Sequence, residues 1–470
     1  MSSKSPMTTI ATVLGVLAVG TAIPAWYRSA PVDSGEANLT GALLVRDGKE
    51  IAPDQIADLM VATWDESQTK AKIFQVKKSD GRWTIPSHFN YPADGGSRVG
   101  STVGGVLNVA RGPLVSRDPK RFEDLGVINP TPKEGLPSEK KGIGKRITLK
   151  DVSGKVVVDL LIGSPAPNGD GVRFVRDVDS NDVYTAKISD TISTAFTDWV
   201  ETGLLKFETN DVRSVLVNDY FIEKDPQTGT GKYTPRAETA FTRKDSSADW
   251  ISGQLPTDMQ VAKDAVNKIL SEATGLKLAG VRPYNPQWLQ MRGFYSSGKD
   301  LFGDEGRLVV STKDGLRYIL FFGQIALGDE EDKDSESAKK STDAGKKEDA
   351  TSTRNRYLAI FVQYDETCDE EALKAAAEKQ AEKKDEAKKD DKKEDKKDPK
   401  QVGMDKAQKA QARFQQFFYV ISDESFKSMK PAIDKLFEAK PKPEEKKDGM
   451  AAPAAPAPSM VPSLMPEPGK

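Results

Sequence analysis

The stretch GIGKRIT (Gly142–Thr148) contains the Gly-Lys pair that binds phosphate in nucleotide-binding loops. A phosphate-binding loop of that kind needs four residues between its first glycine and the Gly-Lys pair, and a Ser or Thr hydroxyl after the lysine. This stretch lacks that spacing, and Arg146 occupies the hydroxyl position. Because a β-rich run follows, we interpret GIGKRIT as a turn that leads into a strand.

The stretch DVDSNDVYTAKI (Asp177–Ile188) begins like a calcium-binding loop. Such a loop needs glycine at its sixth position, for a sharp turn, and a bidentate acid at its twelfth. Asp182 and Ile188 stand at those two positions. The stretch is better explained as the turn of a β-hairpin.

The chain has one histidine, His88, and one cysteine, Cys368. A single cysteine forms no internal disulfide, and a single histidine makes no histidine-rich metal site. No Ser or Cys nucleophile can be assigned to His88 as a general base, so a histidine in an exposed turn is expected. We therefore expect no catalytic, cofactor-binding or metal-ligating residues, no cofactor and no enzymatic activity. A hydrolase built on two carboxylates remains an alternative.

Charge and composition bear on the class of partner. Charged residues make up 30% of the chain, but they nearly cancel to a net charge of −2. A protein that binds nucleic acid through a strongly basic surface would carry a large positive excess. Nucleic acid is therefore not an expected partner.

The N-terminal segment predicts a membrane anchor over residues 1–30. Residues 5–27 carry no charge, and a bilayer core requires about 20 apolar residues to cross. Trp26 and Tyr27 stand where interfacial aromatic residues are common. A cleaved signal peptide, cut after Ala22 or Ala25, is the alternative. With an uncleaved anchor, the lipid bilayer is a partner through residues 5–27, and the large soluble part is expected to face outward.

The tripeptide Ile-Ser-Asp occurs at Ile188–Asp190 and again at Ile421–Asp423, and similar segments precede both. Each copy has a tryptophan (Trp83, Trp250), then Pro-x-Asp ending at Asp94 or Asp258, and then a helical pattern. Three β-rich runs follow, and a glycine ends the first of them. We expect the tryptophans to be core anchors, the aspartates to be helix caps, and a helix to follow each Ile-Ser-Asp. The paired β-rich runs are VVVDLLIGS with LRYILFFGQ, VRFVRDV with RYLAIFVQY, and VYTAKI with FFYVI.

These matches, in one order, predict two tandem copies of an α+β domain with a mainly antiparallel sheet. The first repeat spans 39–207 and the second 212–438. The second repeat contains low-complexity insertions at 329–353 and 368–412, which lack core-forming residues and should be disordered or mobile. The later insertion, rich in Ala, Glu and Lys, could instead form a charged, solvent-exposed helix. Residues 439–470 read as a disordered tail rich in Pro, Ala and Lys.

The first copy also resembles a known family, the domain-of-unknown-function family numbered 4340. The resemblance rests on the tryptophan after a charged turn, the Pro-Ala-Asp before the helix, the LGV-x-x-P sequence and the LLIG sequence, over about Ile56 to Phe207. It implies a bacterial envelope protein with an N-terminal anchor. Members often accompany auxiliary subunits of ABC-type transport systems, including those linked to gliding motility. The family has no established catalytic residues to carry over.

Together these features predict a non-catalytic protein of the bacterial inner membrane, with a single span and its soluble part in the periplasm. The family resemblance alone implies that it acts as a scaffold or accessory partner of an ABC-type transport or motility complex. The alternative is a ligand-binding module that holds a glycan, a peptide or a small molecule in a cleft between the two repeats.

Overall fold

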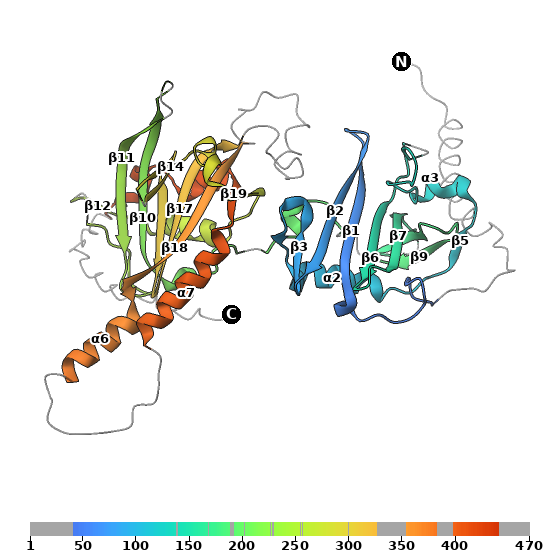
Figure 1. Ribbon diagram of the computed structural model, residues 1–470, viewed down its shortest axis with the longest axis horizontal. Helices are drawn as coiled ribbons and strands as arrows, with labels where there is room; N and C mark the ends of the chain where they lie inside the picture. Colours follow the sequence, from blue (N-terminus) through green and yellow to red (C-terminus); the bar gives the residue numbers. More distant parts are fainter. Residues whose placement is uncertain are drawn as a thin grey trace, which may run out of the picture.

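The computed structural model describes residues 41–137, 140–167, 169–188, 192–201, 203–225, 227, 230–253, 255, 257–298, 300–326, 354–382 and 398–440 (Figure 1). This part of the chain has the expected α+β composition, with several antiparallel sheets and a smaller number of helices. None of its helices is long and apolar enough to span a membrane. The expected anchor at residues 1–30 lies outside the described residues.

A nine-stranded antiparallel sheet forms the centre of the first lobe, residues 41–201. Its strands are β1 (Ile56–Asp65), β2 (Lys70–Ser79), β3 (Arg82–Ile85), β4 (Tyr91–Pro92), β5 (Leu114–Ser116), β6 (Lys145–Asp151), β7 (Val156–Pro165), β8 (Val172–Asp177) and β9 (Val183–Lys187). They lie in the order β4-β3-β2-β1-β6-β7-β8-β9-β5. Most neighbours in this order are also neighbours in sequence, so short turns connect them.

Helix α2 (Gly100–Leu107) packs on one face of this sheet and extends a π-helical turn, η3 (Gly95–Val99). A Cβ on Gly95 would collide with the indole of Trp83, so the glycine allows the close approach of helix and sheet. The remaining helical turns of this lobe are η1 (Pro53–Gln55), η2 (Pro86–His88), η4 (Pro119–Arg121), α3 (Phe122–Leu125) and η5 (Phe196–Asp198).

A seven-stranded antiparallel sheet forms the centre of the second lobe, residues 203–440, and two short ribbons accompany it. The strands are β10 (Val212–Lys224), β11 (Gly231–Thr242), β12 (Met259–Val261), β13 (Gly280–Pro283), β14 (Phe294–Ser297), β15 (Asp300–Gly303), β16 (Arg307–Thr312), β17 (Asp314–Ala326), β18 (Asn355–Asp369), β19 (Phe417–Ser422) and β20 (Phe437–Ala439). The large sheet has the order β11-β10-β16-β17-β18-β19-β13. The ribbons are β12–β20 and β14–β15.

Two helices, α4 and α8, pack together against one face of the second sheet. Helix α4 buries residues spaced three or four apart, as the apolar pattern predicts. Helix α8 begins at the N-cap Ser422, whose hydroxyl accepts a hydrogen bond from the Ser425 amide, and ends before Pro431. The helical elements are α4 (Lys263–Thr274), α6 (Glu370–Glu382), α7 (Pro399–Phe414), α8 (Asp423–Met429), η6 (Thr209–Asp211), η7 (Pro286–Trp288), η8 (Gln290–Arg292) and η10 (Ile433–Leu436).

Seven strands of the first sheet follow the same order as the seven strands of the second. The series β2-β1-β6-β7-β8-β9-β5 corresponds to β11-β10-β16-β17-β18-β19-β13, element by element along the chain. The strand registers correspond as well. The two ladders of facing residues that cross the three central strands are Val61–Ile147–Leu160 and Val217–Leu308–Leu320.

A glycine stands three residues beyond the end of each ladder, at Gly163 and Gly323. A Cβ on Gly163 would overlap the carbonyl oxygen of Leu125, and a Cβ on Gly323 would overlap that of Arg292. In both sheets the glycine therefore lets the preceding loop lie directly against the strand. This requirement explains why a glycine ends the first β-rich run in both copies.

An arginine on the neighbouring strand contacts each of these glycines. The Arg173 side chain donates a hydrogen bond of 2.9 Å to the carbonyl oxygen of Gly163, and Arg356 donates one of 2.8 Å to that of Gly323. Arg356 also pairs with Asp423, the acid of the second Ile-Ser-Asp. The two sheets thus share a side-chain contact as well as an order of strands.

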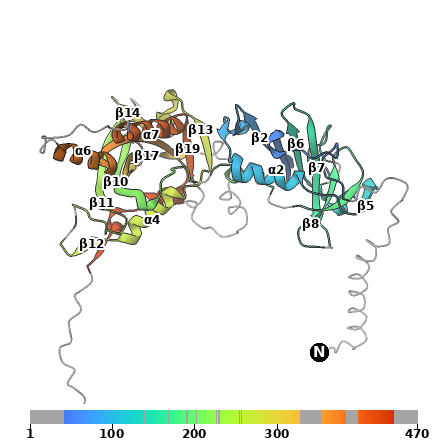
Figure 2. The ribbon, with the colours of Figure 1, turned by 90° about the horizontal axis from the view of Figure 1, so that it is seen from below.

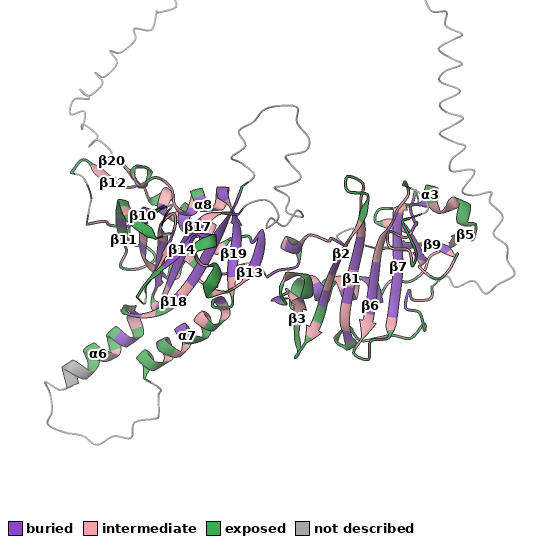
Figure 3. Cartoon of the chain, turned by 45° about the horizontal axis from the view of Figure 1, so that its top comes forward, coloured by how far each residue is buried: buried purple, intermediate pink, exposed green. Residues whose placement is uncertain are grey.

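Buried residues concentrate in the sheets of both lobes (Figure 3). Their apolar side chains form one cluster that includes residues of both lobes. Leu59 and Ile147 belong to it in the first lobe, and Leu320 and Val266 belong to it in the second. The two lobes lie side by side (Figure 2). At their contact the rings of Tyr91 and Phe417 pack edge to face, at a centroid distance of 5.1 Å.

The segment after Ile188 differs from the expected helix. Over residues 192–201 only the turn η5 is helical. The backbone of Trp199 accepts a hydrogen bond from the Asp94 amide, and Val200 forms a bridge with Ala93. Pairing with this neighbouring segment takes the backbone groups that a helix would need for its own hydrogen bonds.

The insertion predicted at 368–412 is also more ordered than expected. Its described residues include the end of β18, all of α6 and most of α7, and α7 packs along β18. Gly403, Ala407 and Phe414 form the buried side of α7. Two of these residues are small, so the sequence of the insertion shows no apolar stripe that would predict the packing of this helix. The insertion at 329–353 and the tail beyond residue 440 lie outside the described residues.

Candidate ligand-binding site

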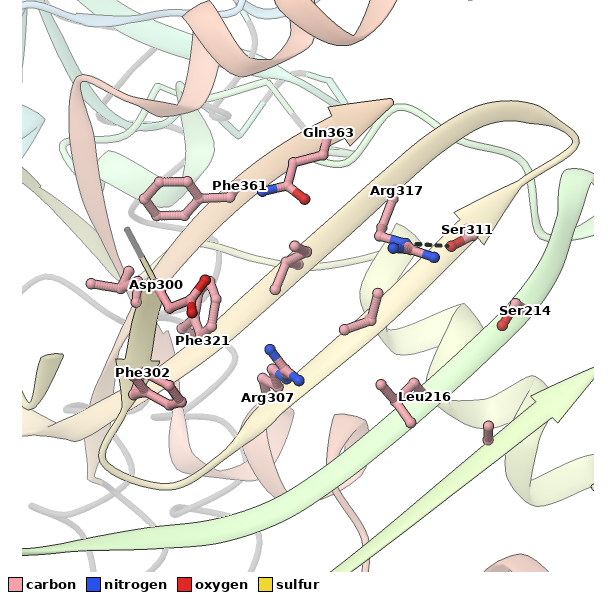
Figure 4. Close-up of a pocket in the computed structure, with 14 residues that line it drawn as sticks. Ser214, Leu216, Asp300, Phe302, Arg307, Ser311, Arg317, Phe321, Phe361 and Gln363 are labelled. Atoms are coloured by element: carbon pink, nitrogen blue, oxygen red, sulfur yellow. Dashed lines mark hydrogen bonds between the residues drawn. The ribbon is translucent and has the colours of Figure 1, made fainter. Parts of the chain in front are cut away.

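A cavity of about 600 Å³ lies on the face of the second sheet that α4 and α8 leave uncovered (Figure 4). Strands β10, β16, β17 and β18 form its floor, and the hairpin β14–β15 forms one rim. We call this cavity the cradle and define it by six residues of the floor and one of the rim. They are Arg307, Val309, Arg317, Ile319, Phe321 and Phe361, with Phe302 on the hairpin.

Strand alternation explains which side chains reach the cradle. Successive residues of a strand point to opposite faces of the sheet. In β16 the side chains of Leu308 and Val310 enter the main core, whereas Arg307 and Val309 face the cradle. The same alternation in β17 turns Ile319 and its second neighbours toward the cavity.

Arg317 lies at one end of the cradle and is already paired. Its guanidinium donates to the Asp365 carboxylate at 2.5 Å. It also donates to the Ser311 hydroxyl at 3.4 Å (Figure 4). Burial alone would raise the pKa of Asp365, but hydrogen bonds from Thr367 and the charge of Arg317 hold it below its ordinary value. Asp365 is therefore ionised at neutral pH, and it neutralises Arg317.

Arg307 is different. Its Nε is buried, and the side chain has no hydrogen bond or ion pair among the residues that the structure describes. A buried donor without an acceptor costs about 1–3 kcal/mol, and more if it is charged. The apolar neighbours Val309, Ile319 and Phe321 offer no acceptor. Arg307 is thus a cation ready for a partner.

The first lobe shows how the fold satisfies an arginine at the same position. Arg146 precedes the ladder residue Ile147 as Arg307 precedes Leu308. The Nε and Nη2 atoms of Arg146 each donate to a carboxylate oxygen of Asp159, both at 2.7 Å. Thr148 donates to the same carboxylate at 3.0 Å.

The second lobe replaces both of these partners with apolar residues. Ile319 stands in the place of Asp159, one residue before Leu320, and Val309 stands in the place of Thr148. The guanidinium is kept and its carboxylate is missing. The arrangement therefore fits recognition of an anion next to apolar surface.

The other polar groups of the cradle fit binding better than a reaction. Ser214 and Ser311 have no neighbouring base in the lining, and Asp300 on the hairpin is its one carboxylate. Nucleophilic catalysis needs a hydroxyl or thiol within hydrogen-bond reach of a base. The described residues also contain no group of three or more His, Cys, Asp or Glu side chains that could hold a metal ion.

The structure places the sequence-predicted residues apart from the cradle. Trp250 is buried, and Trp83 is partly buried against the core, so both serve as the expected anchors. Asp94 caps its helical turn by accepting a hydrogen bond from the Ser97 amide at 3.0 Å. Asp258 caps no helix, because α4 begins after Ala262; its carbonyl oxygen instead accepts a hydrogen bond from Lys440.

His88 lies in the turn η2, as expected, but it is only partly exposed. Its ring stacks on Phe196 at a centroid distance of 4.2 Å, and its Nδ1 lies 2.9 Å from the Ser87 hydroxyl. Cys368 is half-buried near the end of β18, where burial raises the pKa of its thiol.

The two rejected motifs occupy turns. Gly142 has a φ of 68° and lies two residues before the Gly144 that precedes β6, so GIGKRIT is a turn followed by a strand. Residues 177–188 connect β8 to β9 and include β9, as a hairpin requires.

The region between the lobes has fewer features of a ligand-binding site than the cradle has. Its contact is filled by the rings of Tyr91 and Phe417. A cavity of about 550 Å³ lies nearby at the connection, lined by Thr274 and residues between 203 and 209. Its one aromatic residue, Phe207, packs against Tyr318. Of these two cavities, the cradle is the one whose lining has several aromatic residues and a cation without a partner among the described residues.

Comparison with known proteins gives one match. The family model described as "Domain of unknown function (DUF4340)" matches residues 83–253, so the resemblance is confirmed for this segment. The segment covers most of the first lobe and the hairpin β10–β11 of the second. No curated protein matches the chain. No solved structure matches it either.

Proposed function

We propose that this chain is a membrane-anchored, non-catalytic envelope protein that serves as a scaffold or accessory partner of an ABC-type transport or motility complex. Two tandem α+β domains, at 39–207 and 212–438, form its soluble part. The second domain carries the recognition site, which is the cradle. The observation behind this assignment is the buried Nε of Arg307, which has no hydrogen-bond partner among the described residues, whereas the counterpart Arg146 in the first lobe has a carboxylate partner.

Several features support tandem duplication. The order of seven strands, the two ladders and the contacts of Gly163 and Gly323 recur in both lobes. Duplicated domains often diverge, so that one copy keeps a structural role and the other gains a binding role. The anchor rests on residues 5–27, and the transport link rests on the family resemblance alone.

The test is co-purification of the full chain, tagged at its C-terminus, from native membranes in a mild detergent. Mass spectrometry would identify the partners and their stoichiometry. We expect the chain in the membrane fraction, with permease or auxiliary subunits of an ABC-type system.

Two variants make this experiment specific. Arg307→Ala should lose the partner, whereas Arg117→Ala, which removes a surface ion pair with Asp182 in the first lobe, should retain it. A chain that purifies alone, or from the soluble fraction, contradicts the proposal. The alternative function, a ligand-binding module, is then favoured by the same cradle, and ligand screening takes the place of partner capture.

A further inference from the structure

We propose that the cradle binds an acidic side chain of a polypeptide partner, with its carboxylate on Arg307 and the adjacent apolar residues over the phenylalanines. This inference rests on the proposed function, because it names the chemistry that the recognition site selects. The partner supplies to Arg307 the kind of carboxylate that Asp159 supplies to Arg146 within the first lobe.

The first lobe provides the geometry. There a carboxylate from the neighbouring strand reaches both Nε and Nη2 of Arg146, each at 2.7 Å. This two-point contact is the strong form of an arginine–carboxylate pair. In the second lobe Ile319 leaves that place free of an acceptor, on the side of Arg307 that faces the cavity. A carboxylate supplied from outside would reach the guanidinium of Arg307 from the cavity, above Ile319.

The charges select one carboxylate rather than a multiply charged anion. Arg317 is neutralised by Asp365, so Arg307 is the open cation of the cradle lining. Asp300 on the rim adds a negative charge and forms no ion pair with Arg307 in the described structure. One guanidinium with an acid nearby suits a single carboxylate, whereas a phosphate would bring a second charge toward Asp300.

The apolar lining selects what lies beside the carboxylate. Phe302 comes from the hairpin, and Phe321 and Phe361 come from two strands of the floor; the three rings gather at the end of the cradle where the hairpin lies (Figure 4). The floor crosses four strands, which spans about 14 Å at the usual spacing between neighbours. About four residues of extended polypeptide cover that distance. Burying apolar side chains there adds free energy that a lone carboxylate does not provide.

A polypeptide fits this site better than a small carboxylate. The position is one where this fold already holds a side-chain carboxylate, that of Asp159, presented by an extended strand. The cradle is also an open surface across several strands, to which a partner segment has direct access. A small amphiphilic carboxylate, such as dodecanoate, is the competing occupant, and the experiment tests it.

The experiment uses the full chain in detergent and two arrays of fluorescein-labelled heptapeptides. One array has Glu at the centre with varied apolar neighbours, and its twin has Gln in place of Glu. Fluorescence anisotropy gives the dissociation constants. We expect a subset of the Glu peptides to bind about tenfold to a hundredfold more tightly than their Gln twins, because a charged hydrogen-bond pair is lost.

Two variants connect this preference to the cradle. Arg307→Gln should remove the difference between Glu and Gln peptides. Ile319→Asp should abolish binding by giving Arg307 an internal carboxylate, as in the first lobe, and it should not lower the melting temperature. Arg117→Ala is the control that leaves peptide binding unchanged.

Three results would overturn the inference. The first is equal binding of each Glu peptide and its Gln twin. The second is a preference for Glu that survives Arg307→Gln. The third is binding of dodecanoate that depends on Arg307 while no Glu peptide binds. None of them decides the co-purification experiment, so the proposed function can stand if the carboxylate inference fails.

Discussion

Each lobe has an arginine at the equivalent position of an equivalent strand, β6 or β16, but the side chains around the two arginines differ. In the first lobe Arg146 is held by Asp159 and becomes part of the interior. In the second lobe Arg307 faces a cavity lined by phenylalanines, and it has no partner among the described residues. The comparison teaches that two sheets with the same order of strands can leave an equivalent arginine paired in one and without a partner among the described residues in the other.

The largest expected effect comes from breaking the pair in the first lobe. Asp159→Ala leaves the guanidinium of Arg146 without its carboxylate, and the free energy of unfolding should fall by about 3–5 kcal/mol. Arg307→Ala removes an unsatisfied donor and also the packing of the side-chain stem, and because these effects oppose each other the free energy of unfolding should change by less than about 1 kcal/mol. Urea denaturation of both variants measures the difference. Equal losses would mean that the two arginines have equivalent surroundings.

A second pair of variants tests the structural equivalence of the lobes. Gly163→Ala and Gly323→Ala each place a methyl group against a backbone carbonyl, and each should cost about 1–3 kcal/mol. Gly104→Ala is the matched control, because no atom lies near its Cβ and alanine favours the helix. Thermal unfolding of the three variants is the measurement. A large loss in one lobe with none in the other contradicts the equivalence.

A smaller effect is expected where the lobes meet. Arg413 of α7 pairs with Glu201 of the first lobe at 3.3 Å, and both side chains are partly exposed. Arg413→Ala should therefore lower stability by only about 0.2–1 kcal/mol. Glu201→Ala also removes the exposed pair of Glu201 with Lys206, so the double variant should add a further loss of no more than the same small size. A double-mutant cycle in urea gives the coupling, and a value near zero would show that the contact between the lobes rests on its rings alone.

The smallest expected effect is on the loss of stability at acidic pH. Hydrogen bonds from Ser67, followed by those from Lys72 and the Gln68 amide, lower the pKa of Asp65 to about 2 in the folded first lobe, against the opposing effect of burial. A carboxyl whose folded pKa is lowered stabilises the fold above its unfolded pKa of about 4, and this contribution is lost as the pH falls toward 2. Wild type should lose more stability than Asp65→Asn between pH 5 and pH 2. Parallel pH curves for the two proteins in chemical denaturation would exclude this role of Asp65.

Most of the sheet framework was predictable because the repeats carry it in their local patterns. Alternating apolar residues, the terminal glycines and the Pro-x-Asp segments identified the strands and α2 and α4. Two elements escaped prediction for physical reasons. In the segment after Ile188 the Trp199 carbonyl accepts a hydrogen bond from the amide of Asp94, which is far away in sequence. Helix α7 packs through Gly403 and Ala407, and such small residues give no apolar pattern in a charged run.

The candidate site was not predicted, although its signal is present in the repeat alignment. An arginine precedes the apolar run in both GKRITLK and GRLVVST. The acid of VVVDLL is an isoleucine in LRYIL. Arg307 indicates a binding site only when the shared arginine and the missing acid are considered together. They lie on neighbouring strands, so a pattern within a single segment does not connect them.

The connections between the last three long strands of each lobe also set an order of folding. In the first lobe the chain crosses from β7 to β8 and from β8 to β9 through residues 166–171 and 178–182. In the second lobe the same crossings use residues 327–354 and 370–416. Closing a loop costs about 0.6 kcal/mol more for each doubling of its length, before any strand pairing compensates for it.

Contacts between residues far apart in sequence also slow folding. The first lobe should therefore fold early and on its own, as it emerges during synthesis. The second lobe should fold more slowly. Until it does, its exposed apolar strands would need chaperones to prevent aggregation.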